Sequence, residues 1–449
     1  MRRLLLTMAL LLVVPLCALW WLQDVPPWHA ADALEVPAGL GAKLACSGHY
    51  LSGFDRAQNL LDLASYSSVN RLLVIDATAA PGRRAGLPLG PTKEARYHPG
   101  LGCSLVYPDG LDLYTLKVPE VSNPGAEPWP MGLAAPHRDP KLEQLLRDRL
   151  ETDNRQGLNT RALLLVVDGQ LRAEAYAQGI GERTPLLGWS MAKSVTAMLI
   201  GRLESQGKLQ SVERDLFTSW SDDARARISV QQLLQMTSGL AFDENYIPGS
   251  DATRMLFLSP SASDVAMSSP LRHTPGAQFY YSSGTTNLLA RLVYDRLGSS
   301  TQAMIDFFHR EFVQPLRLGG TTFEVDASGV YVGSSYLYAP ARDWARFGYL
   351  LLNGGAINGQ QVLEEEWVAR AVAPNDSEND RRYGYQLWLN GGGEELRWPS
   401  LEPDSYAMKG NRGQVVLMLP EARALIVRLG WNAGQYPIDE YFGPISAAL

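Results

Sequence analysis

Residues 188–203 read GWSMAKSVTAMLIGRL and place a serine and a lysine within an otherwise apolar helix. Ser190 and Lys193 lie three residues apart, so a helix brings their side chains onto one face. Apolar residues recur around them with the spacing of a buried helical stripe: Met191, Val195, Met198, Leu199 and Leu203. The stretch therefore predicts a core helix whose first turn carries a hydroxyl beside an amine.

A buried amine beside a hydroxyl can act as base and nucleophile. A serine hydroxyl is a weak nucleophile until a base takes its proton. A lysine becomes a base near neutral pH when burial lowers its pKa from about 10.4. The alternative is structural: Ser190 caps the helix and Lys193 extends its amine into solvent. The same spacing recurs at Ser205 and Lys208, beside a glycine at a predicted helix end, where we expect a solvated lysine.

The composition is that of a globular protein with more than one domain. The chain has 449 residues, of which 46% are hydrophobic and 19% charged. Its net charge is −7, and because no basic residues cluster, we expect no nucleic-acid partner. The six histidines are isolated from one another, so we expect no metal site and no cofactor.

The N-terminus has the pattern of a membrane-targeting segment. Arg2 and Arg3 precede residues 4–22, which are nineteen residues without a charge. This run is long for a signal-peptide core and about long enough to span a bilayer. We therefore expect residues 1–33 to be an uncleaved membrane anchor, with a cleaved signal ending at the ADA of residues 31–33 as the alternative. In both cases the body is exported, and in the anchored case it lies at the periplasmic face of a bacterial inner membrane.

Export makes a disulfide the expected state of two cysteines. Cys17 lies in the apolar segment, which leaves Cys46 and Cys103 in the body of the protein. Because disulfides persist in oxidising compartments, we expect these two to pair, with two separate buried thiols as the alternative.

The rest of the chain divides into three parts. Residues 34–118 are expected to form a small mixed module. Residues 119–140 are rich in proline and lack periodicity, which predicts a linker or an extended segment across the next domain. Residues 141–449 form the large unit, with a mostly helical part at about 204–275. No internal repeat is present.

Hairpins at both ends of the large unit predict a single sheet. Residues 161–179 read as a hairpin with Asp168-Gly169 as its tight turn, and residues 414–430 read as a second hairpin. Helical patterns fill the sequence between them. We therefore expect an α+β fold, in which the two ends build one antiparallel sheet flanked by helices, together with a helical subdomain.

Five stretches of the large unit resemble the serine β-lactamase and penicillin-binding-protein superfamily, in its class C β-lactamase, esterase and 6-aminohexanoate-dimer hydrolase branch. They occur in the order and spacing of that family: WSMAKS (189–194), ISVQQLLQMTSGL (228–240), HTPGAQFYYSSGTTNLLARLV (273–293), YAPARDWARFGYLLLNGG (338–355) and MKGNRGQVVLMLP (408–420). The resemblance covers about residues 141–435. It implies a β-lactamase/transpeptidase-like fold and a serine hydrolase that works through an acyl-enzyme. The small module is similar to N-terminal extensions of some exported bacterial members, and we expect it to serve in packing.

The resemblance also implies roles for individual residues. Ser190 would be the acylated nucleophile and Lys193 its proton acceptor. Tyr281 falls on the tyrosine of the family's Tyr-x-Asn motif and would pass the proton to the leaving group, with Tyr280 as the alternative register. The backbone N–H groups of Ser190 and Gln414 would form the oxyanion hole.

Two motifs depart from the family pattern. Ser283 replaces the asparagine of Tyr-x-Asn, as in the 6-aminohexanoate-dimer hydrolase branch. The third motif, usually Lys-Thr-Gly or His-x-Gly, reads Asn411-Arg412-Gly413. These four residues are the expected substrate-binding positions. Because the usual cation or imidazole is absent, β-lactams are the least expected substrates. A lesser departure is Met236, where relatives often have histidine.

We therefore expect a serine hydrolase that cleaves small amides or esters through an acyl-enzyme on Ser190. One alternative is an α/β-hydrolase, since GWSMA resembles a Gly-x-Ser-x-Gly elbow. That fold needs a histidine late in the chain, and only His273 and His309 follow Ser190. A second alternative is an envelope-anchored binding module that keeps the fold without the activity. The sequence does not predict the acyl group, the leaving group or the oligomeric state.

Overall fold

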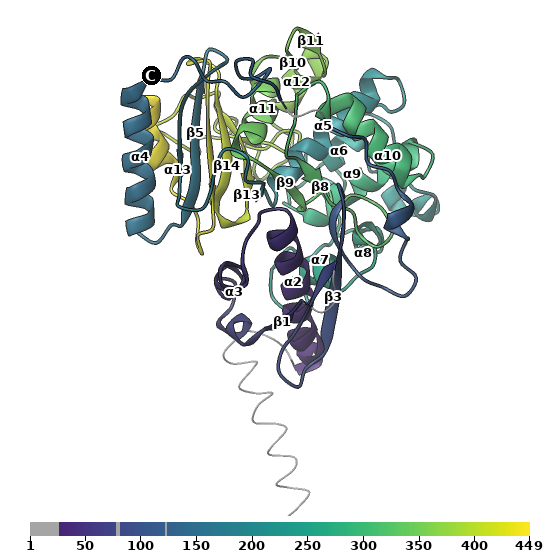
Figure 1. Cartoon of the computed structure of the whole chain (residues 1–449). Coiled ribbons are helices and arrows are strands. Elements are labelled where there is room, and N and C mark those ends of the chain that lie inside the picture. The colour runs from purple at the N-terminus through teal and green to yellow at the C-terminus, as the bar shows by residue number, and fades with distance from the viewer. Residues whose placement is uncertain (1–26, 78–80, 122–123) are drawn as a thin grey trace, which may run out of the picture.

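The computed structural model describes residues 27–77, 81–121 and 124–449 (Figure 1). The apolar stretch predicted as a membrane anchor, residues 4–22, lies outside these ranges. Among the described residues, none of the helices combines the length and the apolar character that crossing a bilayer requires.

The large unit is organised around a six-stranded antiparallel sheet in the order β12-β13-β14-β15-β5-β6. Strands β5 (Thr160–Val167) and β6 (Gln170–Tyr176) come from the start of the unit. The others come from its end: β12 (Trp388–Leu389), β13 (Tyr406–Gly410), β14 (Gln414–Leu419) and β15 (Ala424–Gly430). Since β15 pairs with β5, the two ends build one sheet, and the predicted α+β fold is confirmed.

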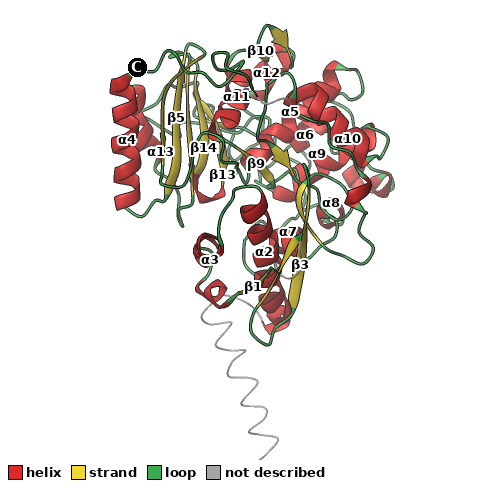
Figure 2. Ribbon diagram, in the orientation of Figure 1, coloured by secondary structure: helices red, strands yellow, loops and turns green. Residues whose placement is uncertain are grey.

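Both faces of the sheet are covered by helices (Figure 2). Leu163 and Leu165 of β5 pack in the core shared with α4 (Pro140–Arg155) and α13 (Ile438–Ser446). Leu164 and Val166 belong to the core of the opposite face, with α11 (Ala341–Leu352) and α5 (Met191–Ser205). Because successive side chains of a strand point to opposite faces, a strand buried on both sides reads as a continuous apolar run.

A helical region lies beside the sheet and contributes part of the lining of the site. Its helices are α6 (Val230–Leu234), α7 (Asp251–Phe257), α8 (Ala262–Met267), α9 (Ser283–Arg296), α10 (Thr301–Phe308) and α12 (Glu365–Ala371). Short strands form two further sheets: β7 (Leu186–Leu187), β9 (Leu337–Ala339) and β8 (Thr322–Phe323) in one, and β10 (Ala356–Ile357) and β11 (Gln360–Gln361) in the other.

The N-terminal module packs directly on the large unit. It consists of α2 (Ala30–Tyr50), α3 (Arg56–Ala64) and the antiparallel strands β1 (Val74–Asp76), β2 (Gly82–Gly86), β3 (Thr92–His98) and β4 (Gly102–Leu105). Helix α2 begins inside the stretch predicted as residues 1–33. It packs against β2 and β3 and also against α7. A Cβ at Gly39 would lie 2.3 Å from the carbonyl oxygen of Phe257, so glycine permits this close contact.

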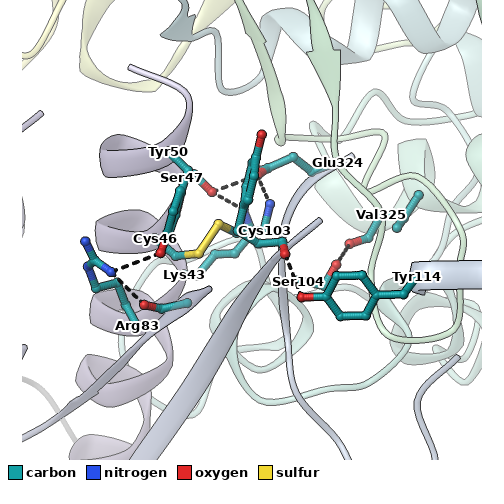
Figure 3. The surroundings of a disulfide bond; sticks show 12 residues. Lys43, Cys46, Ser47, Tyr50, Arg83, Cys103, Ser104, Tyr114, Glu324 and Val325 are labelled. Carbon is teal, nitrogen blue, oxygen red and sulfur yellow. Dashed lines mark hydrogen bonds and ion pairs between the residues drawn. A yellow bond between two sulfur atoms is a disulfide. The ribbon is translucent and has the colours of Figure 1, made fainter. Parts of the chain in front are cut away.

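A disulfide and a buried ion pair hold the module in place (Figure 3). Cys46 of α2 and Cys103 beside it in β4 form the disulfide expected from the sequence. Next to it, Lys43 pairs with Glu324 of the large unit, and these side chains are 2% and 0% exposed. Glu324 also accepts hydrogen bonds from Ser47 Oγ at 2.7 Å and from the Cys103 N–H at 2.6 Å. The carboxylate of the large unit thus binds three groups of the module.

Loss of Lys43 leaves the Glu324 carboxylate buried without its counter-charge. We expect Lys43→Met to lower the free energy of unfolding by about 3–5 kcal/mol. The double variant Lys43→Met/Glu324→Gln removes the charge as well and should lose less. Urea unfolding followed by tryptophan fluorescence measures both variants. If Lys43→Met alone were as stable as the wild type, this role of the ion pair would be contradicted.

The proline-rich segment runs over α11 as an extended strap. Arg346 donates hydrogen bonds to the carbonyl oxygens of Pro130 and Gly132, at 2.9 and 2.8 Å. Arg342 donates to the carbonyl oxygen of Leu133 at 2.8 Å. Two buried arginines of one helix therefore bind three backbone carbonyl oxygens of this segment.

Candidate active site

The hydroxyl of Ser190 and the amine of Lys193 meet at the first turn of α5. Lys193 Nζ donates hydrogen bonds to Ser190 Oγ at 2.9 Å, to Ser283 Oγ at 2.9 Å and to the carbonyl oxygen of Ser334 at 3.0 Å. The Ser190 side chain caps no backbone N–H of the helix. Lys193 is only 1% exposed. The alternative of a capping serine and a solvated lysine is therefore wrong for this pair.

Burial gives the Lys193 amine the properties of a base. It lowers the pKa of Lys193 from 10.5 to about 8, while the negative charge of Glu244 raises it in part. A share of the amine is then neutral at neutral to weakly alkaline pH, and a neutral amine can take the proton of Ser190.

The backbone on either side of the nucleophile is held tightly. Trp189 has a φ of +48°, which lies in the left-handed region. This conformation is energetically unfavourable for any residue that carries a side chain. At the end of β13, a Cβ on Gly410 would lie 2.1 Å from the carbonyl oxygen of Gly188. Because glycine allows this approach, β13 ends directly beside the backbone that carries Ser190.

Tyr281 places a phenol ring beside the pair. Lys193 Nζ lies 5.0 Å from the centroid of its ring. Burial raises the pKa of Tyr281 above its ordinary range, the charge of Glu244 raises it further, and a hydrogen bond with Ser190 lowers it in part. Tyr281 is therefore a neutral phenol that can donate a proton. Tyr280 is 40% exposed, so of the two neighbouring tyrosines it is Tyr281 that lies at the site.

Glu244 belongs to the site and was not predicted from the sequence. Its carboxylate accepts hydrogen bonds from the Ser283 hydroxyl and from the Ser283 N–H, both at 2.6 Å. Tyr246 also donates to it, at 3.0 Å. Burial raises the pKa of Glu244, and the charge of Lys193 opposes that rise. The glutamate lies in the irregular loop between α6 and α7, where neither periodicity nor a motif marks it.

Gln414, whose backbone N–H is the predicted oxyanion donor, begins β14 directly after the turn that follows β13. It is 1% exposed, and its side-chain amide exchanges two hydrogen bonds with the backbone of Gly430, at 2.5 and 3.0 Å. Gly410 and Asn411, which precede it, line the cavity that contains Ser190.

The other residues of the third motif serve the packing as well as the cavity. Arg412 lines the cavity, but its guanidinium lies 3.6 Å from the ring centroid of Tyr66 and donates to the carbonyl oxygen of Ser65 at 3.1 Å. Gly413 has a φ of +73°, in the left-handed region that favours glycine. Arg412 is thus turned toward the N-terminal module.

A cavity of about 580 Å³ opens on Ser190 and Tyr281. Trp388 and Lys409 contribute to its lining. Burial lowers the pKa of Lys409 to about 8, and its amine lies 5.2 Å from the ring centroid of Trp388. Throughout the part of the chain that the structure describes, no group of three or more His, Cys, Asp or Glu side chains is arranged to hold a metal ion.

Two other motif positions are structural. Ser205 Oγ donates to the carbonyl oxygen of Arg202 at 2.9 Å, and Lys208 is exposed. The second Ser-x-x-Lys pair therefore does not have the buried arrangement of Ser190 and Lys193. Met236 Sδ accepts a hydrogen bond from the Ser282 N–H at 3.3 Å.

The large unit matches a known family, and the chain is similar to several known proteins. The Beta-lactamase family model matches residues 142–432. The 6-aminohexanoate-dimer hydrolase of Paenarthrobacter ureafaciens is 24% identical over 308 residues, which are 65% of this chain and 75% of that protein.

Solved structures have the same fold. A proposed 6-aminohexanoate-dimer hydrolase from Bacillus anthracis matches with a TM-score of 0.58 and 20% identity, over 75% of this chain and 94% of that one. A penicillin-binding-protein homologue from Caulobacter crescentus matches with a TM-score of 0.54 and 15% identity, over 69% of this chain and 98% of that one. The N-terminal module precedes the residues that match the family model.

Proposed function

Because this chain belongs to the Beta-lactamase family of serine hydrolases, we propose that it cleaves small amides or esters through an acyl-enzyme on Ser190. The observation that carries the proposal is the hydrogen bond of 2.9 Å between the buried Lys193 amine and the Ser190 hydroxyl. The relative from Paenarthrobacter, named for hydrolysis of the 6-aminohexanoate dimer, supports a small-molecule substrate.

In the first half of the reaction, Ser190 is acylated. The neutral amine of Lys193 takes the hydroxyl proton as Oγ attacks the carbonyl carbon of the substrate. The backbone N–H groups of Ser190 and Gln414 stabilise the oxyanion. Tyr281 gives its proton to the leaving group and regains one from Lys193 as the bond to the leaving group breaks.

In the second half, water hydrolyses the ester formed on Ser190. The same groups act in reverse: Tyr281 and Lys193 accept a proton from the attacking water and return one to Ser190 Oγ. The products are a carboxylic acid and the free enzyme. No cofactor takes part in the proposed sequence of steps.

Glu244 is proposed as a positioning residue that acts through Ser283. Its charge raises the pKa of Lys193, and the base works in its neutral form, so kcat/KM should rise with pH through that pKa. We expect Glu244→Gln to move the midpoint of this rise to lower pH, because the neutral amide no longer favours the ammonium. Profiles of kcat/KM from pH 5 to pH 10 measure the effect.

Glu244→Asp provides the matched control, since it keeps the charge but shortens the reach to Ser283. It should lose rate while keeping a midpoint close to that of the wild type. A Glu244→Gln profile that coincides with the wild-type profile would contradict the proposed role.

A side-by-side assay tests the function itself. p-Nitrophenyl esters, short linear amides and nitrocefin are incubated with the wild type and with Ser190→Ala. We expect the wild type to hydrolyse esters or amides and Ser190→Ala to be inactive, with nitrocefin the poorest substrate. Failure on every substrate, together with failure of a fluorophosphonate to modify Ser190, would favour the envelope-anchored binding module instead.

We also propose that the protein is exported and tethered to the membrane by residues 4–22. The disulfide between Cys46 and Cys103 supports an oxidising compartment. Fractionation of cells should recover the protein with membranes; recovery in the cytosol would contradict export.

A further inference from the structure

The N-terminal module forms part of the wall of the cavity that opens on Ser190. Helix α2 contributes four apolar residues to the lining: Ala33, Val36, Pro37 and Leu40. The segment after α3 contributes Tyr66, Ser67, Val69 and Asn70, around the short 3-10 turn Ser68–Leu72. All eight residues precede position 142, where the match to the family model begins. This wall therefore lies outside the residues that match the family model.

Specific contacts fix the wall against the catalytic strands. The guanidinium of Arg412 lies over the ring of Tyr66, with 3.6 Å to its centroid. Trp431 Nε1, at the end of β15, donates to the carbonyl oxygen of Asp62 at 3.0 Å. The carboxylate of Asp62 pairs with Arg161 of β5 at 2.5 Å, and both side chains are buried. These contacts join the module to β5, to the turn after β13 and to the end of β15, and so hold it against the site.

The wall supplied by α2 is apolar, and the large unit extends it with Pro248 and Phe257. The large unit also contributes polar and charged lining residues such as Lys409 and Asn411, and the segment after α3 contributes Ser67 and Asn70. A volume of about 580 Å³ is typical of cavities that enclose a ligand much larger than an acetyl group. An apolar wall of this kind favours a substrate that carries a hydrocarbon chain.

The aromatic residues indicate which part of the substrate meets this wall. Tyr281, the proposed proton donor to the leaving group, stacks on Trp388, with 5.2 Å between the ring centroids. Tyr66 contacts instead Trp189, the residue before the nucleophile, with 6.1 Å between centroids. The leaving group therefore lies on the side of Tyr281, and the acyl group extends toward Tyr66 and α2.

Building on the proposed hydrolase function, we infer that α2 forms an acyl-chain site, so that the enzyme prefers substrates with a medium-length aliphatic acyl group. The N-terminal module is then a specificity element and not only a packing module. The chain would lie against Ala33, Val36, Pro37 and Leu40, while the carbonyl carbon stays at Ser190.

A series of p-nitrophenyl esters with one leaving group tests the inference: acetate, butyrate, hexanoate and octanoate. With the wild type, kcat/KM should rise about three- to fourfold for each added methylene until the cavity is filled. Ala33→Phe fills the space beside α2, and the ratio of kcat/KM for octanoate to that for acetate should fall at least tenfold. Ala31→Phe is the matched control, because Ala31 is exposed on the same helical turn, and it should keep the wild-type ratio.

Two results would overturn the inference: a wild-type series that is flat with chain length, or equal ratios in the wild type and Ala33→Phe. Thermal melting of each variant checks that it is folded. Hydrolysis of all four esters at similar rates would refute the acyl-chain site and leave the proposed hydrolase function standing. Hydrolysis of none of them, with Ser190 unreactive toward a fluorophosphonate, would refute both.

Discussion

Replacement of Lys193 by methionine is expected to lower kcat/KM by about 10⁴-fold or more. Methionine has a similar length and suits a position that is only 1% exposed, but it has no basic nitrogen. Ser190 then has no neighbouring amine to take its proton, while the backbone N–H groups and the cavity remain. Initial rates on the best ester or amide substrate, measured at a pH near 8.5, give the loss.

Lys208→Met is the matched control for this experiment. Lys208 stands three residues after Ser205 in the second copy of the spacing and is exposed. Its replacement should leave the rate within a factor of two of the wild type. A Lys193→Met enzyme that keeps a tenth of the wild-type rate would show that another group activates Ser190.

Ser190→Ala is expected to abolish acylation and to lower kcat by about 10⁵- to 10⁶-fold. The hydroxyl that is removed caps no backbone N–H, so the melting temperature should stay close to that of the wild type. Intact-mass spectrometry after incubation with a fluorophosphonate should show one adduct on the wild type and none on the variant.

Ser205→Ala controls for the loss of a hydroxyl elsewhere on α5. Its side chain bonds only the helix backbone and Arg202, and the variant should be labelled like the wild type. Labelling of Ser190→Ala at the wild-type rate would place the nucleophile at another residue.

Local patterns in the sequence were sufficient to predict the architecture. The tight turn at Asp168-Gly169 separates two apolar runs, and its conformation is confirmed by φ values of +49° and +69°. Both of its strands, β5 and β6, belong to the main sheet. The pair Ser190 and Lys193 is likewise local, because a spacing of three residues on a helix fixes the proximity of two side chains.

The positions that were missed depend on contacts between distant segments. Glu244 reaches the site because a loop folds over Ser283, 39 residues further along the chain, and no local pattern encodes that contact. Arg412, with a φ of +62°, lies in the turn between β13 and β14, and Asn411 of the same turn lines the cavity.

The contact of α2 with the cavity could not be predicted from the sequence for the same reason. From the sequence, the stretch up to residue 33 reads as the end of a targeting segment and the residues after it as a packing module. In the structure Ala33 lies in the helix Ala30–Tyr50 and lines the cavity of Ser190, which lies more than 150 residues away in sequence. Such a contact depends on tertiary packing. Helical periodicity indicates which face of a helix is buried, but it does not indicate which segment packs against that face.

The account depends on a neutral amine at Lys193, and the pH dependence of Ser190 phosphonylation tests this most directly. The rate of fluorophosphonate labelling, followed by intact mass from pH 5 to pH 10, reports the activation of the hydroxyl without any assumption about the substrate. We predict a rate that rises about tenfold per pH unit at low pH and levels off above a midpoint near 8, the value to which burial lowers the pKa of Lys193. A rate that is independent of pH, or equal in Lys193→Met, would contradict the proposed base.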